Sequence, residues 1–171
     1  MFISRWLRWF NARRWYKNGC AVHASHAYQE AVACFQRAVD LNPGYADAWF
    51  GLGTALARLN KWKDALRSMD RALDLNYNFE EAIVNKAMIL SNLGQHAEAL
   101  AYSEQATTLR PRDEAAWIEL GNALQALGRF DEAQRAYQRA VELKPTDYHL
   151  LRYVRDRQIE RWDRALKERR F

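Results

Sequence analysis

Residues 49–76 read WFGLGTALARLNKWKDALRSMDRALDLN, and the pattern returns 68 residues later as WIELGNALQALGRFDEAQRAYQRAVELKP from Trp117. Since 68 is twice 34, a third copy is expected halfway between them, where Ile83 begins IVNKAMILSNLGQHAEALAYSEQATTLRP. One period upstream, Trp15 begins WYKNGCAVHASHAYQEAVACFQRAVDLNP. The chain therefore consists mainly of four copies of one 34-residue unit, at 12–45, 46–79, 80–113 and 114–147.

Each unit predicts two closely packed helices. In the first helix, a large residue such as Trp49 is followed four positions later by a small one such as Gly53. The helix is expected to end at a break, which falls at His26, Asn60, Gly94 and Gly128. The second helix carries recurring alanines and is expected to end at Leu41, Leu75, Leu109 and Leu143. Few glycines and prolines and no alternating β-branched runs predict an all-α fold.

The third unit departs most from the pattern. Lys86 stands where Leu52 and Leu120 are found in other units, and Ser103 stands where Phe35 and Tyr137 are found. His96 and, in the first unit, Asn18 also depart from the pattern. These positions predict looser joints, or, for Lys86, a packed aliphatic stem with its ammonium turned to water.

The large, small, alanine, alanine, proline pattern resembles the tetratricopeptide repeat (TPR) family over residues 12–147. The resemblance implies a right-handed α-solenoid of antiparallel helix pairs, in which the first helices line a concave groove. The groove residues that it implies are Tyr16, Phe50, Thr54, Arg58, Val84, Met88, Asn92, Ile118, Asn122 and Gln125.

Four of these groove residues form an apolar ladder with one rung per repeat, namely Tyr16, Phe50, Val84 and Ile118. A partner segment could lay its side chains on the ladder while its backbone bonds to Asn92, Asn122 or Gln125. The alternative is that these residues only fill a narrow groove. We expect a non-enzymatic scaffold, adaptor or assembly factor that binds a protein or peptide partner.

The two ends lie outside the repeats. Residues 148–171 have apolar positions near helical spacing and predict a capping helix on the fourth repeat. Residues 1–11 predict an amphipathic helix that caps the first repeat, binds a membrane surface or docks on another protein. Its apolar face carries Phe2, Ile3, Trp6, Leu7, Trp9 and Phe10, and its other face carries Arg5 and Arg8. The docking interpretation makes the chain a permanent structural subunit of a larger membrane complex.

Composition restricts the other function classes. Residues 1–18 have a net charge of +5 and residues 148–171 of +4, whereas residues 19–147 have −4, which disfavours a nucleic-acid surface. Two cysteines indicate no disulfide framework, and a cytoplasmic chain, peripheral at the inner face of a membrane in the anchor interpretation, is expected. Cys20, His23 and His26 lack zinc-site spacing. We therefore expect no metal, cofactor or catalytic residue; oligomeric state is not indicated.

Overall fold

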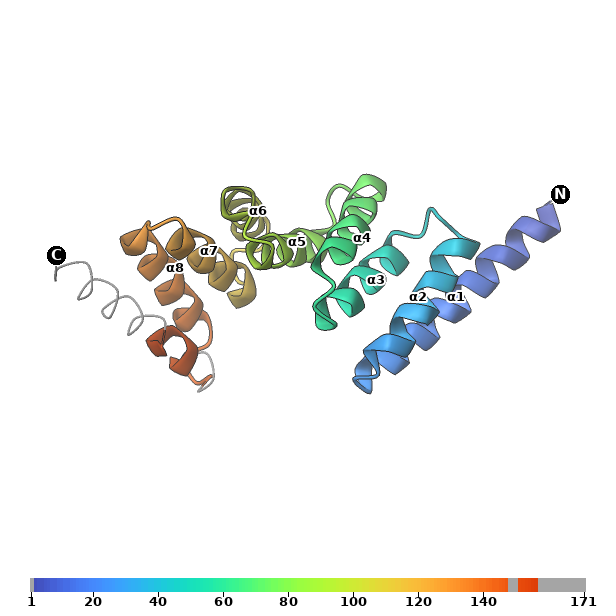
Figure 1. Cartoon of the computed structure of the whole chain (residues 1–171), viewed down its shortest axis with the longest axis horizontal. Helices are drawn as coiled ribbons and strands as arrows, with labels where there is room; N and C mark the ends of the chain where they lie inside the picture. The colour runs from blue at the N-terminus through green and yellow to red at the C-terminus, as the bar shows by residue number, and fades with distance from the viewer. Residues whose placement is uncertain (1, 148–150, 157–171) are drawn as a thin grey trace. The chain divides into compact units, whose positions relative to one another are not determined.

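A computed structural model describes residues 2–147 and 151–156, with side chains described from residue 8 onward. These ranges contain no strand; eight helices span residues 2–143, and residues 151–156 are also helical (Figure 1). The eight helices are α1 (Phe2–Ala24), α2 (Tyr28–Leu41), α3 (Ala46–Arg58), α4 (Trp62–Leu75), α5 (Glu80–Asn92), α6 (His96–Leu109), α7 (Glu114–Ala126) and α8 (Phe130–Leu143). The predicted all-α repeat fold is confirmed.

The helices belong to two compact units, Met1–Gly94 with α1–α5 and Gln95–Phe171 with α6–α8. In the first unit each helix packs on the next one along the chain. In addition α1 contacts α3, and α3 contacts α5, so the first helices of successive repeats are neighbours. In the second unit α6 packs on α7, and α7 packs on α8. The division between the units falls inside the third repeat, between Gly94 and Gln95.

The predicted helix ends are confirmed. A residue with positive φ follows the first helix of every repeat: His26 at 64°, Asn60 at 58°, and Gly94 and Gly128 at 77° each. Asparagine and glycine tolerate this left-handed conformation better than other residue types, which is why the chain turns there. The second helices end at the four predicted leucines, Leu41, Leu75, Leu109 and Leu143.

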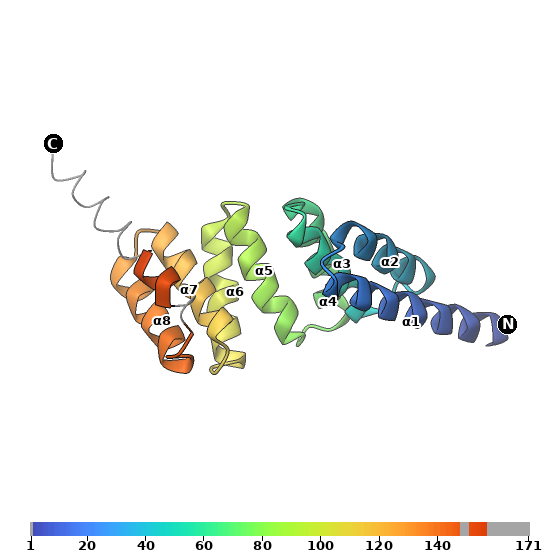
Figure 2. The same ribbon diagram turned by 90° about the horizontal axis from the view of Figure 1, so that it is seen from below.

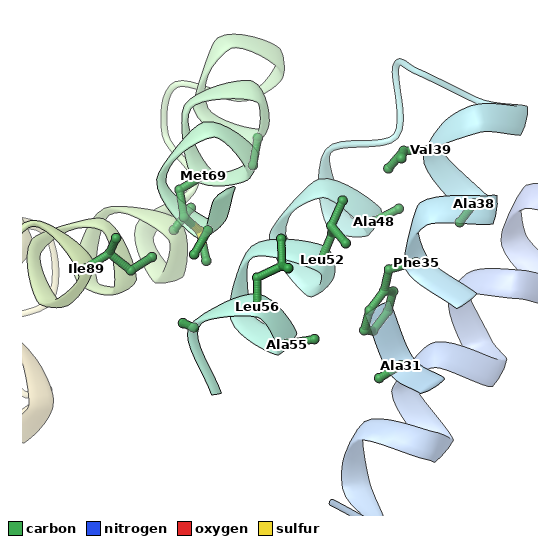
Figure 3. Close-up of a cluster of buried hydrophobic side chains, with 14 residues drawn as sticks. Ala31, Phe35, Ala38, Val39, Ala48, Leu52, Ala55, Leu56, Met69 and Ile89 are labelled. Carbon is green, nitrogen blue, oxygen red and sulfur yellow. The ribbon is translucent and has the colours of Figure 1, made fainter. Parts of the chain in front are cut away.

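Small residues allow the paired helices to approach closely. A Cβ atom added at Gly19 of α1 would lie 2.7 Å from Cε1 of Phe35 in α2. Phe35 is buried in a cluster that includes Ala48 and Leu52 of α3 (Figure 3). The repeated glycine and alanine positions are thus packing requirements of the helix pairs.

Two tryptophans, in the second and fourth repeats, each bond to the turn that precedes their helix. The indole Nε1 of Trp49 donates to the carbonyl oxygen of Pro43 at 2.9 Å. In the fourth repeat, Nε1 of Trp117 donates to the carbonyl oxygen of Pro111 at 3.0 Å. Both bonds join the turn at the end of one repeat to the first helix of the next. In these two repeats the tryptophan therefore fixes the junction with the preceding repeat as well as filling space.

The departures in the third repeat have separate explanations. Lys86 of α5 places its ammonium 2.6 Å from the Asp70 carboxylate of α4, and only 13% of its side chain is exposed. Its charge therefore meets an acid on the neighbouring helix. Ser103 of α6 is buried and donates its hydroxyl to the carbonyl oxygen of Ala99 at 2.7 Å. A short polar side chain is satisfied there within its own helix.

Residues 2–24 form one uninterrupted helix, which continues through residue 11, the end of the segment expected before the repeats. At 23 residues, α1 is longer than α2 with 14, and its N-terminal part extends beyond its partner (Figure 2). The extra N-terminal element is therefore an extension of the first repeat helix. Because α1 contains no turn, residues 2–11 continue along the helix axis and do not fold back over the first repeat.

At the other end, the described residues 151–156 pack against the fourth repeat. Val154 is buried in a cluster with Leu124 and Tyr137. The C-terminal cap stays a prediction, because the rest of the predicted capping helix lies outside the described residues. No helix in the described parts of the chain combines the length and apolarity needed to cross a membrane.

Candidate functional site

Three predicted groove residues of the first unit share one environment. Tyr16 of α1, Phe50 of α3 and Met88 of α5 are each partly buried against the same core cluster. Because α1 contacts α3 and α3 contacts α5, side chains at these positions continue from one helix to the next. Tyr16 and Phe50 are one 34-residue period apart, whereas Met88 lies four residues after Val84, the next position of the predicted ladder. The groove itself stays a prediction.

Two further aromatic residues, which the groove prediction missed, join this arrangement. Tyr45 is the N-cap of α3, and its ring centroid lies 5.0 Å from that of Tyr16. Phe79 is the N-cap of α5, and its ring centroid lies 4.8 Å from that of Phe50. The signal in the sequence was their own 34-residue spacing. We refer to Tyr16, Tyr45, Phe50, Phe79 and Met88 as the aromatic face.

Polar groups lie beside the aromatic face. Nδ2 of Asn85 in α5 donates to Oγ1 of Thr54 in α3 at 3.3 Å, and this Thr54 hydroxyl donates to the carbonyl oxygen of Phe50 at 2.9 Å. Thr54 and Asn85 are both partly exposed. The hydrogen bond links the first helices of the second and third repeats and leaves amide and hydroxyl capacity for a ligand.

The tyrosines of the aromatic face are neutral. Burial, followed by a hydrogen bond with Cys20, raises the pKa of Tyr16 far above its usual value, and Asp47 adds to this effect. Burial and Asp47 also raise the pKa of Tyr45, against an opposing effect of Arg13. Both hydroxyls therefore stay protonated at neutral pH, where each can donate and accept a hydrogen bond.

Arg58 and Asn92, also predicted groove residues, are exposed at the ends of α3 and α5. Asn92 donates from Nδ2 to the carbonyl oxygen of Met88 at 2.8 Å. Burial, followed by electrostatic interactions with Arg58 and His26, lowers the pKa of His23. His23 is thus neutral at pH 7, and Arg58 supplies the positive charge at this end of the face.

Val84 and Gln125 lie deeper than the other predicted groove residues, with 7% and 8% of their surface exposed. In the second unit, the Asn122 side-chain oxygen accepts from the Tyr137 hydroxyl at 2.8 Å and from the Tyr153 hydroxyl at 2.7 Å. The Gln125 amide oxygen lies 3.1 Å from the same Tyr137 hydroxyl. These two amides therefore already take part in a tyrosine network, and Ile118 packs against the apolar cluster around Leu124.

The start of α1 exposes aromatic residues. Trp9 and Phe10 are 47% and 50% exposed, and Arg8 is exposed beside them. The Arg13 guanidinium lies 5.6 Å from the ring centroid of Trp9, in a cation–π contact. The side chains of the other predicted docking residues, Phe2, Ile3, Arg5, Trp6 and Leu7, lie outside the described residues.

Metal-binding and nucleophilic groups are sparse. Within the residues that the structure describes, no three histidine, cysteine or acidic side chains are grouped as metal ligands. Cys20 and Cys34 are free thiols, and burial raises the pKa of the Cys34 thiol. A raised pKa keeps a thiol protonated and makes it a weaker nucleophile at neutral pH.

Tetratricopeptide repeat models match residues 16–78, 80–113 and 114–147. The chain therefore belongs to the tetratricopeptide repeat family, and it carries a protein-interaction scaffold of that class. No curated protein matches it in sequence.

Solved structures with the same fold include other TPR proteins. YrrB, described as a TPR protein with an unusual peptide-binding site, is 28% identical, with a TM-score of 0.74 over 85% of this chain and 74% of that one. MamA from Desulfovibrio magneticus RS-1 is 21% identical, with a TM-score of 0.78 over 91% and 88%. PilF of Pseudomonas aeruginosa is 16% identical, with a TM-score of 0.77 over 91% and 71%. At these lower identities the likeness concerns the fold.

Proposed function

We propose that the chain is a non-enzymatic adaptor or assembly factor that binds a segment of a partner protein on the aromatic face. One observation carries this proposal: aromatic pairs repeat at 34 residues on neighbouring first helices, with Thr54 and Asn85 beside them. A partner segment can lay apolar side chains on such a surface and bond its backbone to the flanking polar groups. The likeness to YrrB supports a peptide ligand.

The partner-binding residues in this proposal are Tyr16, Phe50, Thr54, Met88, Arg58 and Asn92, extended by Tyr45 and Phe79. Val84 contributes chiefly to packing because it is buried. In the second unit, the corresponding predicted positions are Ile118 and Asn122, which are partly exposed, and Gln125, which is buried. In this proposal a partner contacts Ile118 directly. Asn122 and Gln125 support that surface through their hydrogen bonds with the Tyr137 hydroxyl.

The test compares variants that remove apolar contacts with variants that remove exposed polar ones. Phe50→Asp places a charge on the aromatic face, and the double variant Arg58→Ala/Asn92→Ala alters only exposed side chains. Both should lower partner binding; a central aromatic contact typically contributes 2 kcal/mol or more, about a 30-fold change. Tyr77→Asp, at a residue that is 79% exposed in the loop before α5, is the matched control.

Circular dichroism and thermal unfolding separate loss of binding from loss of fold. Reduced binding by Arg58→Ala/Asn92→Ala with unchanged unfolding supports a direct contact, because these side chains are not part of the core. If a partner bound by the full chain is retained equally by Phe50→Asp and Tyr77→Asp, the aromatic face is not the binding surface.

We also propose that α1 associates peripherally with a membrane. Exposed Trp9 and Phe10, together with five basic and no acidic residues in positions 1–18, support this assignment. Sedimentation of the full chain with anionic vesicles, and release when residues 1–11 are deleted, is the expected result. Equal sedimentation of the truncated chain would contradict it.

The second candidate function is a permanent structural subunit of a larger complex, docked through the same part of α1. The exposed Trp9 and Phe10 favour it, since exposed aromatic residues are common anchors of protein interfaces. Such a subunit would co-purify with its complex at a fixed stoichiometry in high salt. An adaptor would exchange its partners under the same conditions.

A further inference from the structure

The exposed end of the first repeat differs from the other repeat junctions. Ala48 and Leu52 of α3 are buried, and so is Ala116 of α7. One 34-residue period before Ala48 and Leu52, the corresponding residues of α1 are Arg14 and Asn18, and both are exposed. Positions that pack against another repeat elsewhere are therefore charged or polar on α1.

The basic residues of this end lie in line with the exposed aromatic residues of the same helix. Phe10, Arg14 and Lys17 follow one another at intervals of four and three residues, which places them on one stripe of α1. All three are exposed. The opposite side of α1 carries Ala12 and Gly19, which are buried against the first unit. We refer to Phe10, Arg14 and Lys17, with Trp9 and Arg13 beside them, as the basic-aromatic stripe.

The positive charge of the stripe indicates which kind of partner can bind to it. No acidic residue precedes Glu30, whereas five basic residues occur before that position. Two copies of α1 placed face to face would bring these like charges together, which disfavours a second copy of the chain as the occupant. A negatively charged surface complements the stripe, and exposed tryptophan and phenylalanine suit the boundary between lipid headgroups and acyl chains.

We infer that the basic-aromatic stripe binds an anionic lipid surface and holds the chain by its first repeat. This inference rests on the membrane association proposed above and adds the residues that select anionic lipid. Trp9 and Phe10 enter the interface, while Arg13, Arg14 and Lys17 meet the headgroups with extended side chains.

The test uses the full chain and vesicles of phosphatidylcholine, with or without phosphatidylglycerol. The unmodified chain should sediment with the anionic vesicles, less so at high salt, and poorly with the neutral ones. Arg14→Ala/Lys17→Ala should lower the partition coefficient about 30-fold, from about 1 kcal/mol for each basic residue at an anionic surface. Lys61→Ala/Lys63→Ala removes the same charge at exposed positions of the second repeat and is the matched control, with binding retained.

Each outcome decides a separate point. If the unmodified chain binds neither kind of vesicle, the membrane association itself fails. If it binds anionic vesicles and Arg14→Ala/Lys17→Ala binds as tightly, the stripe is not the contact. Equal losses in the two double variants would mean that net charge alone governs binding and would also overturn the inference. Binding to soluble polyglutamate without vesicle binding would assign the stripe to an acidic protein instead.

Discussion

Phe79, the N-cap of α5, lies 4.8 Å from Phe50 of α3, measured between ring centroids. Tyr45 and Tyr16 repeat this relationship one period earlier at 5.0 Å. In each pair, a residue at the start of one first helix contacts a residue inside the preceding one. The aromatic face therefore joins successive repeats as well as forming the proposed binding surface, so its variants need both stability and binding measurements.

The Phe50–Phe79 contact predicts a measurable coupling energy. Replacing either phenylalanine by leucine removes the aromatic pair and retains much of the apolar volume. A double-mutant cycle of Phe50→Leu and Phe79→Leu should give a coupling of about 0.5–1.5 kcal/mol in urea unfolding. A coupling near zero would mean that the two rings only fill space independently.

The close approach of α1 and α2 predicts that Gly19 tolerates no large side chain. A Cβ at Gly19 would already contact the buried Phe35 at 2.7 Å, so Gly19→Leu forces the two helices apart. Overpacking of this kind costs about 1–3 kcal/mol, and the variant should melt several degrees lower. Gly44→Leu is the control, because a Cβ there lies 3.5 Å from the nearest atom, Oδ1 of Asn42. Equal melting temperatures for the two variants would contradict the packing argument.

The contact between the C-terminal segment and the fourth repeat predicts an effect of a single hydroxyl. Tyr153→Phe removes the 2.7 Å bond to Asn122 and leaves the ring in place. The loss should destabilise the second unit by about 1 kcal/mol, a typical value for one hydrogen bond. Tyr77→Phe removes a hydroxyl from a residue that is 79% exposed and should leave unfolding unchanged. A Tyr153→Phe variant as stable as the original would show that this bond contributes nothing.

His23 predicts a pH dependence with a defined sign. Burial, with Arg58 and His26 nearby, lowers its pKa, and its Nε2 atom is buried without a hydrogen-bond partner in the described structure. The unfolded chain takes up a proton at His23 near pH 6.5, before the folded chain does. Its contribution is therefore complete above that pH and declines as the pH falls below it. Melting temperatures at pH 7.5 and 5.5 should differ less in His23→Gln than in the original chain. An unchanged difference would exclude His23 as the cause.

Much of the fold follows from short-range rules that are visible in the sequence. Asn60 and Gly94 mark helix ends because their residue types adopt positive φ readily. Leu41 and its three counterparts end the second helices because proline, or a turn in its place, follows shortly afterwards. Gly19 is small because a large aromatic residue of the paired helix occupies the space beside it. Periodicity at 34 residues allowed each of these rules to be applied four times.

The site was less predictable, because its details depend on contacts between segments. Tyr45 and Phe79 are N-cap residues that come just before α3 and α5. The groove prediction covers only positions within the first helices, so it does not include them. Asn122 and Gln125 occupy predicted groove positions, yet tyrosines of α8 and the C-terminal segment bond to them.

The most direct test of the central claim is quantitative binding of a partner identified with the full chain, measured for Phe50→Asp, Arg58→Ala/Asn92→Ala and Tyr77→Asp. A partner segment on the aromatic face predicts about 30-fold weaker binding for Phe50→Asp and a clear loss for Arg58→Ala/Asn92→Ala. Tyr77→Asp should bind as the original chain does. Equal affinities for all four proteins, with unchanged helicity, would contradict binding at this face.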